Sequence, residues 1–207
     1  MAEKALPAIE TILDLCRAIL DNGDGLLEEA RILKDHGKSA RSYALGVLAL
    51  EEFSKLPMLN RYAIGEFLEQ PLGRLGWSSV KERMLSHDRK LRMNAWLERS
   101  VPLAEIDEES YRILRKRSES LHRRKLEAIY VDIRGTSVLS PLVEISASEA
   151  EEMLRLADQF RAFHHKIMDT AFSVLSGPPT AEARRSLSEL LAQAEDEGLL
   201  FRPPGSV

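Results

Sequence analysis

The chain has 207 residues and a formal net charge of −4, with 44% hydrophobic and 30% charged residues, a composition that excludes general disorder. No run approaches the roughly 20 consecutive apolar residues of a membrane span, and the single cysteine, Cys16, excludes an internal disulfide framework. We therefore expect a cytoplasmic protein without membrane association. It should form one domain over residues 1–200, followed by a flexible tail over 201–207.

Apolar residues recur every three or four positions along nearly the whole chain, which predicts helices. The first helix is expected over 6–36, with residues 22–25 as a break or a cap. A second starts at about Ala40 and should kink or end at Pro57, because proline cannot donate a backbone hydrogen bond, although the apolar period continues to Phe67. Further helices are expected over 78–101, 106–126, 149–175 and 180–195.

Two local signals complete this outline. Residues 128–133 are rich in β-branched and aromatic side chains, but the segment is too short to form a sheet. We therefore expect a short extended link over 128–141. Ser148 and Glu151 have capping-box spacing at the start of the helix over 149–175. The sequence therefore predicts an all-α bundle of five or six helices that includes this link.

Charge is distributed unevenly along the chain. Residues 74–134 contain 15 basic and 10 acidic side chains, a net +5, while the remainder contains 14 basic and 23 acidic ones, a net −9. A basic middle between acidic flanks predicts a local anion-binding surface. A solvated helix face with unequal charges is the simpler alternative.

The first candidate motif places Glu51, Glu52 and Lys55 within an apolar helix. Lys55 lies three and four positions after the two glutamates, so either pair can meet on one helix face. One interpretation is a surface ion pair worth about 0.3–0.5 kcal/mol. The other is a half-buried pair with perturbed pKa values, because small residues nearby would let another helix approach closely.

The second motif contains Arg83, His87 and Lys90, at spacings of four and three residues. On one helix these cations would flank the imidazole, lower its pKa and favour the neutral form that acts as a base. They would also stabilise charge that develops on a phosphate during RNA cleavage. The alternative is an exposed histidine on a basic helix.

The third motif is a run of seven basic residues from Arg112 to Lys125, which includes Arg124 and leads into Tyr130 and Asp132. Such a helix can neutralise a phosphate backbone, but aromatic residues for base stacking are almost missing from it. This composition favours phosphate contact without sequence reading. Because no nucleotide-binding glycine loop or repeated metal-ligand motif is present, we expect no cofactor and no metal.

In this order, the three motifs resemble the AbiV family of bacterial abortive-infection proteins, a branch of the HEPN-type helical bundles. The resemblance covers residues 26–141. Its matching features are an alanine-leucine helix that runs into Glu51-Glu52-x-x-Lys55, then His87-x-x-Lys90-Leu91, then Tyr130-Val131-Asp132, and a loop that reaches Pro141.

The resemblance implies phage defence, in which the cell stops supporting phage growth through impaired translation. It also implies dimers, and HEPN-type domains are commonly metal-independent endoribonucleases with an Arg and a His separated by four to six residues. Arg83 is one residue too close to His87 for this motif. The pairs that fit are Arg31 with His36, Arg115 with His122 and Arg117 with His122.

We therefore expect a HEPN-type phage-defence effector that acts on RNA or on the translation machinery, as a homodimer and with a phage protein as trigger. Metal-independent RNA cleavage and non-catalytic binding of a phage or host protein stay open as its mode of action. The predicted catalytic residues are His87, Glu52 and Lys90. The predicted phosphate ligands are Lys55, Arg83, Arg124 and Lys125, and the predicted positioning residues are Glu51, Tyr130 and Asp132.

Overall fold

The computed structural model describes residues 6–69, 76–87, 89–90 and 108–196. The predicted tail over 201–207 and the second half of the predicted helix over 78–101 lie outside these residues. The elements in chain order are α1 (Ile9–Asp35), α2 (Ser39–Phe53), α3 (Leu56–Phe67), α4 (Trp77–Leu85), α6 (Glu108–Ile129), β1 (Asp132–Arg134), β2 (Ser137–Leu139), α7 (Pro141–Glu144), α8 (Ala147–Leu175) and α9 (Ala181–Asp196).

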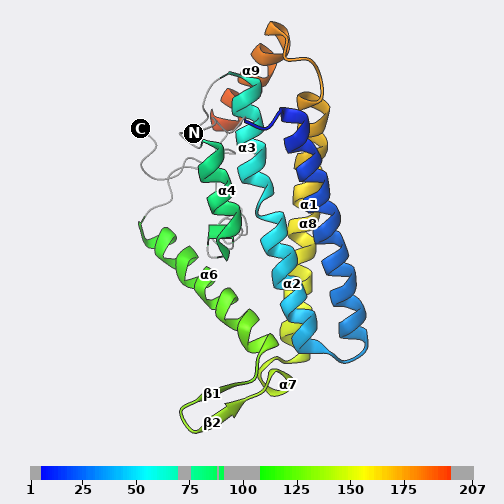
Figure 1. Cartoon of the computed structure of the whole chain (residues 1–207), viewed down its shortest axis with the longest axis vertical. Coiled ribbons are helices and arrows are strands. Elements are labelled where there is room, and N and C mark those ends of the chain that lie inside the picture. The colour runs from blue at the N-terminus through cyan, green and yellow to red at the C-terminus, as the bar shows by residue number, and fades with distance from the viewer. Residues whose placement is uncertain (1–5, 70–75, 88, 91–107, 197–207) are drawn as a thin grey trace.

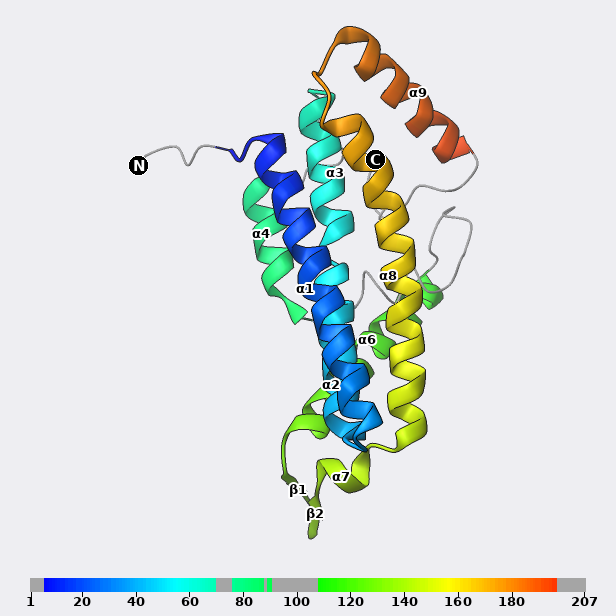
Figure 2. The ribbon, with the colours of Figure 1, turned by 90° about the vertical axis from the view of Figure 1, so that its right-hand side faces the viewer.

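Helices α1, α2 and α8 lie side by side and form the centre of the molecule (Figures 1 and 2). Val47, Ala49 and Leu50 lie on different sides of α2 and are all fully buried, so neighbouring elements cover much of this helix. Gly46 lets α8 approach closely, because a Cβ at this position would lie 2.8 Å from Cγ of Met153. The all-α bundle expected from the periodicity is confirmed.

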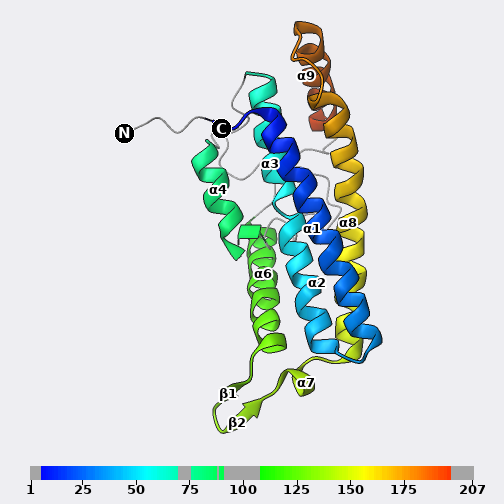
Figure 3. The same cartoon turned by 45° about the vertical axis from the view of Figure 1, so that its right-hand side comes forward.

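The predicted kink near Pro57 is a complete interruption between α2 and α3. Helix α2 ends at Phe53, and the Ser54 hydroxyl donates a 2.8 Å hydrogen bond to the carbonyl oxygen of Glu51. Pro57 lies in the first turn of α3, where the backbone N–H that proline lacks would have no helical acceptor. The proline therefore begins the new helix, and α3 continues along the bundle beyond α2 (Figure 3).

The predicted break at residues 22–25 does not occur, because α1 continues through both glycines of this segment. Gly23 is buried against the ring of Phe53, and a Cβ on Gly23 would lie only 2.4 Å from Cε1 of that ring. The glycine serves close packing between α1 and α2 rather than a turn.

The capping box of α8 is formed by Ser146 and Glu149, two residues before the predicted pair. The Ser146 hydroxyl accepts the Glu149 N–H at 3.2 Å, and the Glu149 carboxylate accepts the Ser146 N–H at 2.9 Å. The sequence contains two overlapping Ser-x-x-Glu spacings here. Burial of Ile145, directly before Ser146, fixes where the chain enters the helix.

The segment expected to be an extended link contains a β-hairpin. Strands β1 and β2 pair antiparallel, with Ile133 opposite Val138, and Gly135 in the turn has a left-handed φ of 62°. The hairpin projects beyond the end of the bundle, beside α7 (Figure 1). We expected this segment to be too short to form a sheet, but a tight turn at a glycine allows two short strands to pair.

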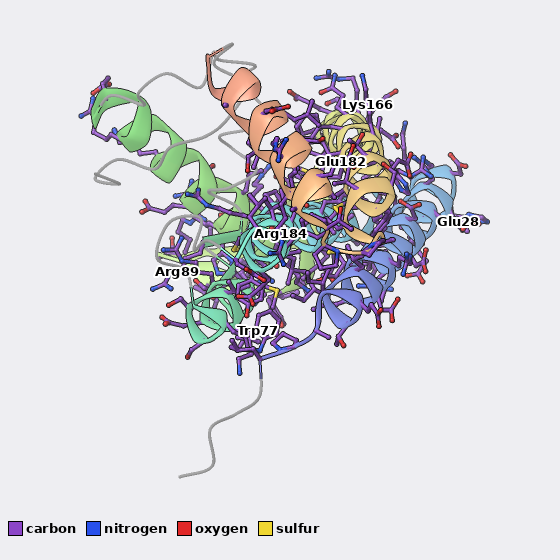
Figure 4. The ribbon with its side chains drawn as sticks, turned by 90° about the horizontal axis from the view of Figure 1, so that it is seen from above. Glu28, Trp77, Arg89, Lys166, Glu182 and Arg184 are labelled. Atoms are coloured by element: carbon purple, nitrogen blue, oxygen red, sulfur yellow. The ribbon has the colours of Figure 1, made fainter. Side chains whose placement is uncertain are left out.

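Helix α9 folds back against the opposite end of the bundle. Thr180 caps it, because its Oγ1 accepts the Ala183 N–H at 3.1 Å. Nε of Arg184 donates a 3.0 Å hydrogen bond to the carbonyl oxygen of Phe67, which ties α9 to the end of α3 (Figure 4). Among the helices that the structure describes, none is long and apolar enough to cross a membrane.

Candidate functional site

A buried carboxylate joins three parts of the chain. Glu51 on α2 is 1% exposed, and its Oε1 accepts a 2.5 Å hydrogen bond from Nζ of Lys125 on α6. Its Oε2 lies 2.5 Å from Nδ1 of His87 and 3.4 Å from Nζ of Lys90, both in the segment after α4. With His122, described below, these residues form the Glu51 cluster.

The partners of Glu51 keep it ionised. Burial by itself would raise the pKa of Glu51, but hydrogen bonds from Lys125 and His87 and the charge of Lys90 hold it below the ordinary value. Both lysine side chains are also buried, at 5% and 7% exposure. One carboxylate and two ammonium groups leave this part of the cluster with one net positive charge beside the histidine.

The hydrogen bond to Glu51 determines which His87 nitrogen is available for chemistry. An ionised carboxylate can only accept, so Nδ1 of His87 must be the donor, which leaves Nε2 to take up or release a proton. The His87 side chain is 52% exposed, so it is open to a ligand although its anchor is buried.

A second imidazole lies against the first. The rings of His87 and His122 are stacked, with centroids 5.7 Å apart and planes inclined by 28°. Nδ1 of His122 is buried and has no hydrogen-bond partner in the part of the chain that the structure describes. Two histidines from different helical segments thus meet above one carboxylate.

The local fold explains why His87 and Lys90 reach Glu51 together. Helix α4 ends at Leu85, and Ser86 is extended, with ψ at 112°. The chain is helical again at His87 and at residues 89–90, so His87 and Lys90 lie one turn apart on a new helical segment. The prediction that Arg83 and His87 share one helix face is wrong, because the break at Ser86 separates them.

Glu52 and Lys55 bind each other rather than the cluster. Their side chains form a 2.5 Å ion pair and are 17% and 20% exposed. Adjacent residues on a helix point about 100° apart, so only one of the two glutamates can face α6. The glutamate partner of His87 is Glu51, where we expected Glu52.

Arg124 on α6 contacts carboxylates. Its guanidinium binds Glu127 at 2.8 Å and Glu149 at 2.6 Å, and it also donates to the carbonyl oxygen of Glu144. These contacts join α6, α7 and α8. The predicted phosphate ligand Arg124 is therefore engaged in an ion-pair network within the protein.

Two predicted positioning residues lie outside the Glu51 cluster, beside and within the hairpin. Tyr130 is 60% exposed, and the Asp132 carboxylate accepts a 2.8 Å hydrogen bond from the backbone N–H of Ile133. From the sequence, His122 was considered only for its spacing to Arg115 and Arg117. The side chains of these two arginines are not among those that the structure describes. A clearer signal was the three-residue spacing of His122 and Lys125, which places both on one face of α6.

The model of the AbiV family of HEPN domains matches residues 11–162, from α1 into α8. The chain belongs to the AbiV family. The match includes every member of the Glu51 cluster, and membership implies a role in HEPN-type abortive infection. No curated protein and no solved structure is significantly similar to the chain. Within the described part of this AbiV-family protein, no group of His, Cys, Asp and Glu is arranged to hold a metal ion.

Proposed function

We propose that this AbiV-family protein is a phage-defence effector that cleaves RNA without a metal ion, and that His87 transfers protons in the reaction. One observation carries the proposal. A half-exposed imidazole is oriented by a buried, ionised carboxylate, which leaves its Nε2 available, and a second imidazole is stacked against it. Two such groups supply the general base and the general acid that RNA cleavage requires.

In the proposed reaction, Nε2 of His87 removes the proton from a ribose 2′-hydroxyl. The resulting oxygen attacks the adjacent phosphorus, and the bond from phosphorus to the 5′-oxygen breaks. His122 gives a proton to this leaving oxygen, and the products are a 2′,3′-cyclic phosphate and a 5′-hydroxyl. Glu51 is a positioning residue, and the net positive charge that Lys90 and Lys125 supply stabilises the charge on the phosphorane.

Arg83 and Lys55 are proposed phosphate contacts outside the cluster. Arg83 is half-buried near the end of α4. Burial lowers the pKa of the neighbouring Arg61, and the charge of Arg83 lowers it further. Lys55 pairs with Glu52 near the junction of α2 and α3, so its ammonium group would be shared between Glu52 and a phosphate.

A second candidate function is non-catalytic binding, and the burial of Lys90 and Lys125 favours it. A buried network of one carboxylate and its cations can serve to hold α2, α6 and the segment after α4 in one arrangement. The protein would then act by binding a translation component or a phage protein. We propose homodimerisation and a phage protein trigger in either case.

Phage challenge of cells that express variants of the protein tests the proposal. In His87→Gln the amide can still donate to Glu51 but cannot exchange a proton, so protection and RNA fragments with 2′,3′-cyclic phosphate ends should both be lost. His165→Gln is the matched control, because His165 of α8 also contacts a carboxylate, that of Asp24 on α1 at 3.0 Å, but lies outside the Glu51 cluster. Full protection by His87→Gln with intact RNA would contradict cleavage, and a lowered melting temperature in this variant would favour the network function.

A further inference from the structure

The described side chains of α6 meet the bundle near its C-terminal end. Towards its N-terminus the helix diverges from α2 (Figures 1 and 4), and the described side chains before Leu121 are exposed. Leu121 packs against the core, and Ala128 is buried. These two residues are seven positions apart and so lie on one face of the helix. Because this apolar stripe is narrow, the rotation of α6 about its own axis is fixed by its polar contacts.

Arg124 and Lys125 flank this apolar stripe on either side, because adjacent helix residues point about 100° apart. Lys125 donates a 2.5 Å hydrogen bond to Glu51 of α2. Nε and Nη2 of Arg124 both donate to Oε1 of Glu149 on α8, at 3.1 and 2.6 Å. The two cations therefore attach α6 to α2 on one side and to α8 on the other.

The contact between Arg124 and Glu149 is rigid on both sides. Oε2 of Glu149 accepts the N–H of Ser146 at 2.9 Å and its hydroxyl at 2.8 Å, within the capping box of α8. Nη1 of Arg124 donates to Glu127 at 2.8 Å, so all three guanidinium nitrogens donate within the protein. A planar guanidinium bound in this way is a more rigid anchor than an ammonium group on a flexible stem. Arg124 therefore fixes the rotation of α6 more firmly than Lys125 does.

The position of His122 depends on this rotation. His122 lies three positions before Lys125, on the side of α6 that faces His87. Side-chain atoms lie about 5–6 Å from the axis of a helix, so a rotation of about 30° would displace the imidazole by about 3 Å. The ring centroids of His87 and His122 are 5.7 Å apart, so a displacement of this size would break their stacking.

We propose that Arg124 and Glu149 are positioning residues, which set the rotation of α6 and thereby place His122 against His87. Neither of them touches the reacting atoms. This role rests on the proposed RNA cleavage, in which His122 gives a proton to the leaving oxygen. It replaces the phosphate contact that the sequence predicted for Arg124, because the guanidinium nitrogens already donate to carboxylates of the protein.

The two roles of Arg124 give opposite expectations for Arg124→Lys. Lysine keeps the positive charge, so a phosphate contact would survive the change and cleavage would stay near the wild-type rate. Lysine cannot form the planar double contact with Glu149, so the positioning role predicts a lower kcat with an unchanged KM. The decrease in kcat should be about 10–100-fold, because misplacing a reacting group by about 1 Å can cost about 10²-fold.

Glu149→Gln removes the same contact from the side of α8. Glutamine also serves in a capping box, so the start of α8 should stay intact, but its amide nitrogen cannot accept a hydrogen bond from Arg124. The variant should therefore lose kcat as Arg124→Lys does. The double variant should lose no more than either single one, because all three lack the same contact. Glu151→Gln is the matched control, since the exposed carboxylate of Glu151, also on α8, pairs with Lys34 at 3.4 Å.

Proton NMR of the full chain detects the placement of His122 without catalysis, and the dispersion of the same spectra shows whether each variant is folded. Nuclear Overhauser effects between the ring protons of His87 and His122 should be present in the wild type and in Glu151→Gln, and lost in Glu149→Gln. If the wild type shows them but leaves RNA intact, RNA cleavage is refuted, while their loss in Glu149→Gln still supports the placement of His122. Unchanged ring contacts or an unchanged kcat in Glu149→Gln would overturn the proposal, as would a wild-type kcat in Arg124→Lys.

Discussion

Nδ1 of His87 lies 2.5 Å from Oε2 of Glu51, although 36 positions separate the two residues in the chain. This contact defines the roles of both side chains. The buried carboxylate fixes the tautomer of the imidazole, and the imidazole helps to keep the carboxylate charged. The stability and the chemistry of the Glu51 cluster are therefore coupled. Substitutions of Glu51 and of His87 distinguish the contribution to stability from the contribution to chemistry.

Replacing Glu51 by glutamine should destabilise the fold strongly. The change removes the negative charge that compensates two buried ammonium groups, Lys90 and Lys125, and loss of one partner of a buried charge group costs about 3–5 kcal/mol. Glu52→Gln is the matched control, because it breaks only a local pair with Lys55 and should cost about 1 kcal/mol or less. Urea unfolding followed by circular dichroism measures both. Equal losses in the two variants would mean that the Glu51 cluster does not stabilise the fold.

Stability should fall as the pH is lowered from 7 to 5. Burial among aromatic rings, reinforced by the charge of His165, lowers the pKa of His164 from 6.5 to about 3. The unfolded chain therefore binds a proton at His164 as pH falls through 6.5, while the folded chain does not, and folding loses about 2 kcal/mol over this interval.

His164→Leu should remove most of this pH dependence, whereas His36→Gln, at an exposed histidine, should retain it. The comparison is made above pH 5, because the carboxylates with lowered pKa values, such as Glu51 and Asp24, contribute their loss of stability only at lower pH. Free energies of unfolding at pH 5, 6 and 7 give the slope. The same slope in wild type and His164→Leu would show that His164 is not the group that titrates.

The two glycines in the middle of α1 should respond oppositely to alanine. At Gly23 the new methyl group would lie 2.4 Å from the buried Phe53 ring, and overpacking of about 1–3 kcal/mol should outweigh the gain in helix propensity. At Gly25 nothing lies within 4 Å, so alanine should stabilise the protein by about 0.5–1 kcal/mol. Thermal unfolding of both variants is the measurement, and a stabilised Gly23→Ala protein would contradict the close packing of α1 on α2.

Much of the fold could be predicted because it follows from local patterns. The apolar period predicted the long helices, and the three-residue spacing of Glu52 and Lys55 correctly allowed their ion pair. Where a helix boundary was predicted wrongly, the sequence contained an equivalent signal a few residues away. Two overlapping capping boxes precede α8, and burial of Ile145 selects the first of them.

The site was harder to predict, because it depends on docking between distant segments. Whether Glu51 or Glu52 meets the histidine depends on which face of α2 lies against α6, and Lys125 is 74 positions from Glu51. The break at Ser86 rotates His87 away from the face that carries Arg83. The hydrophobic periodicity of the sequence contains no information on either feature. The sequence motifs therefore identified the types of residue in the site, but not which of these residues contact one another.

RNA cleavage by His87 is tested most directly with protein purified from phage-infected cells, so that any trigger has already acted. Wild type and His87→Gln are incubated with total RNA in EDTA, after equal melting temperatures confirm that both are folded. We predict cleavage with 2′,3′-cyclic phosphate ends by the wild type and at least a hundredfold slower cleavage by the variant, since acid–base groups typically contribute about 10²–10⁴-fold. Intact RNA with the wild type, or equal cleavage by both proteins, would contradict it.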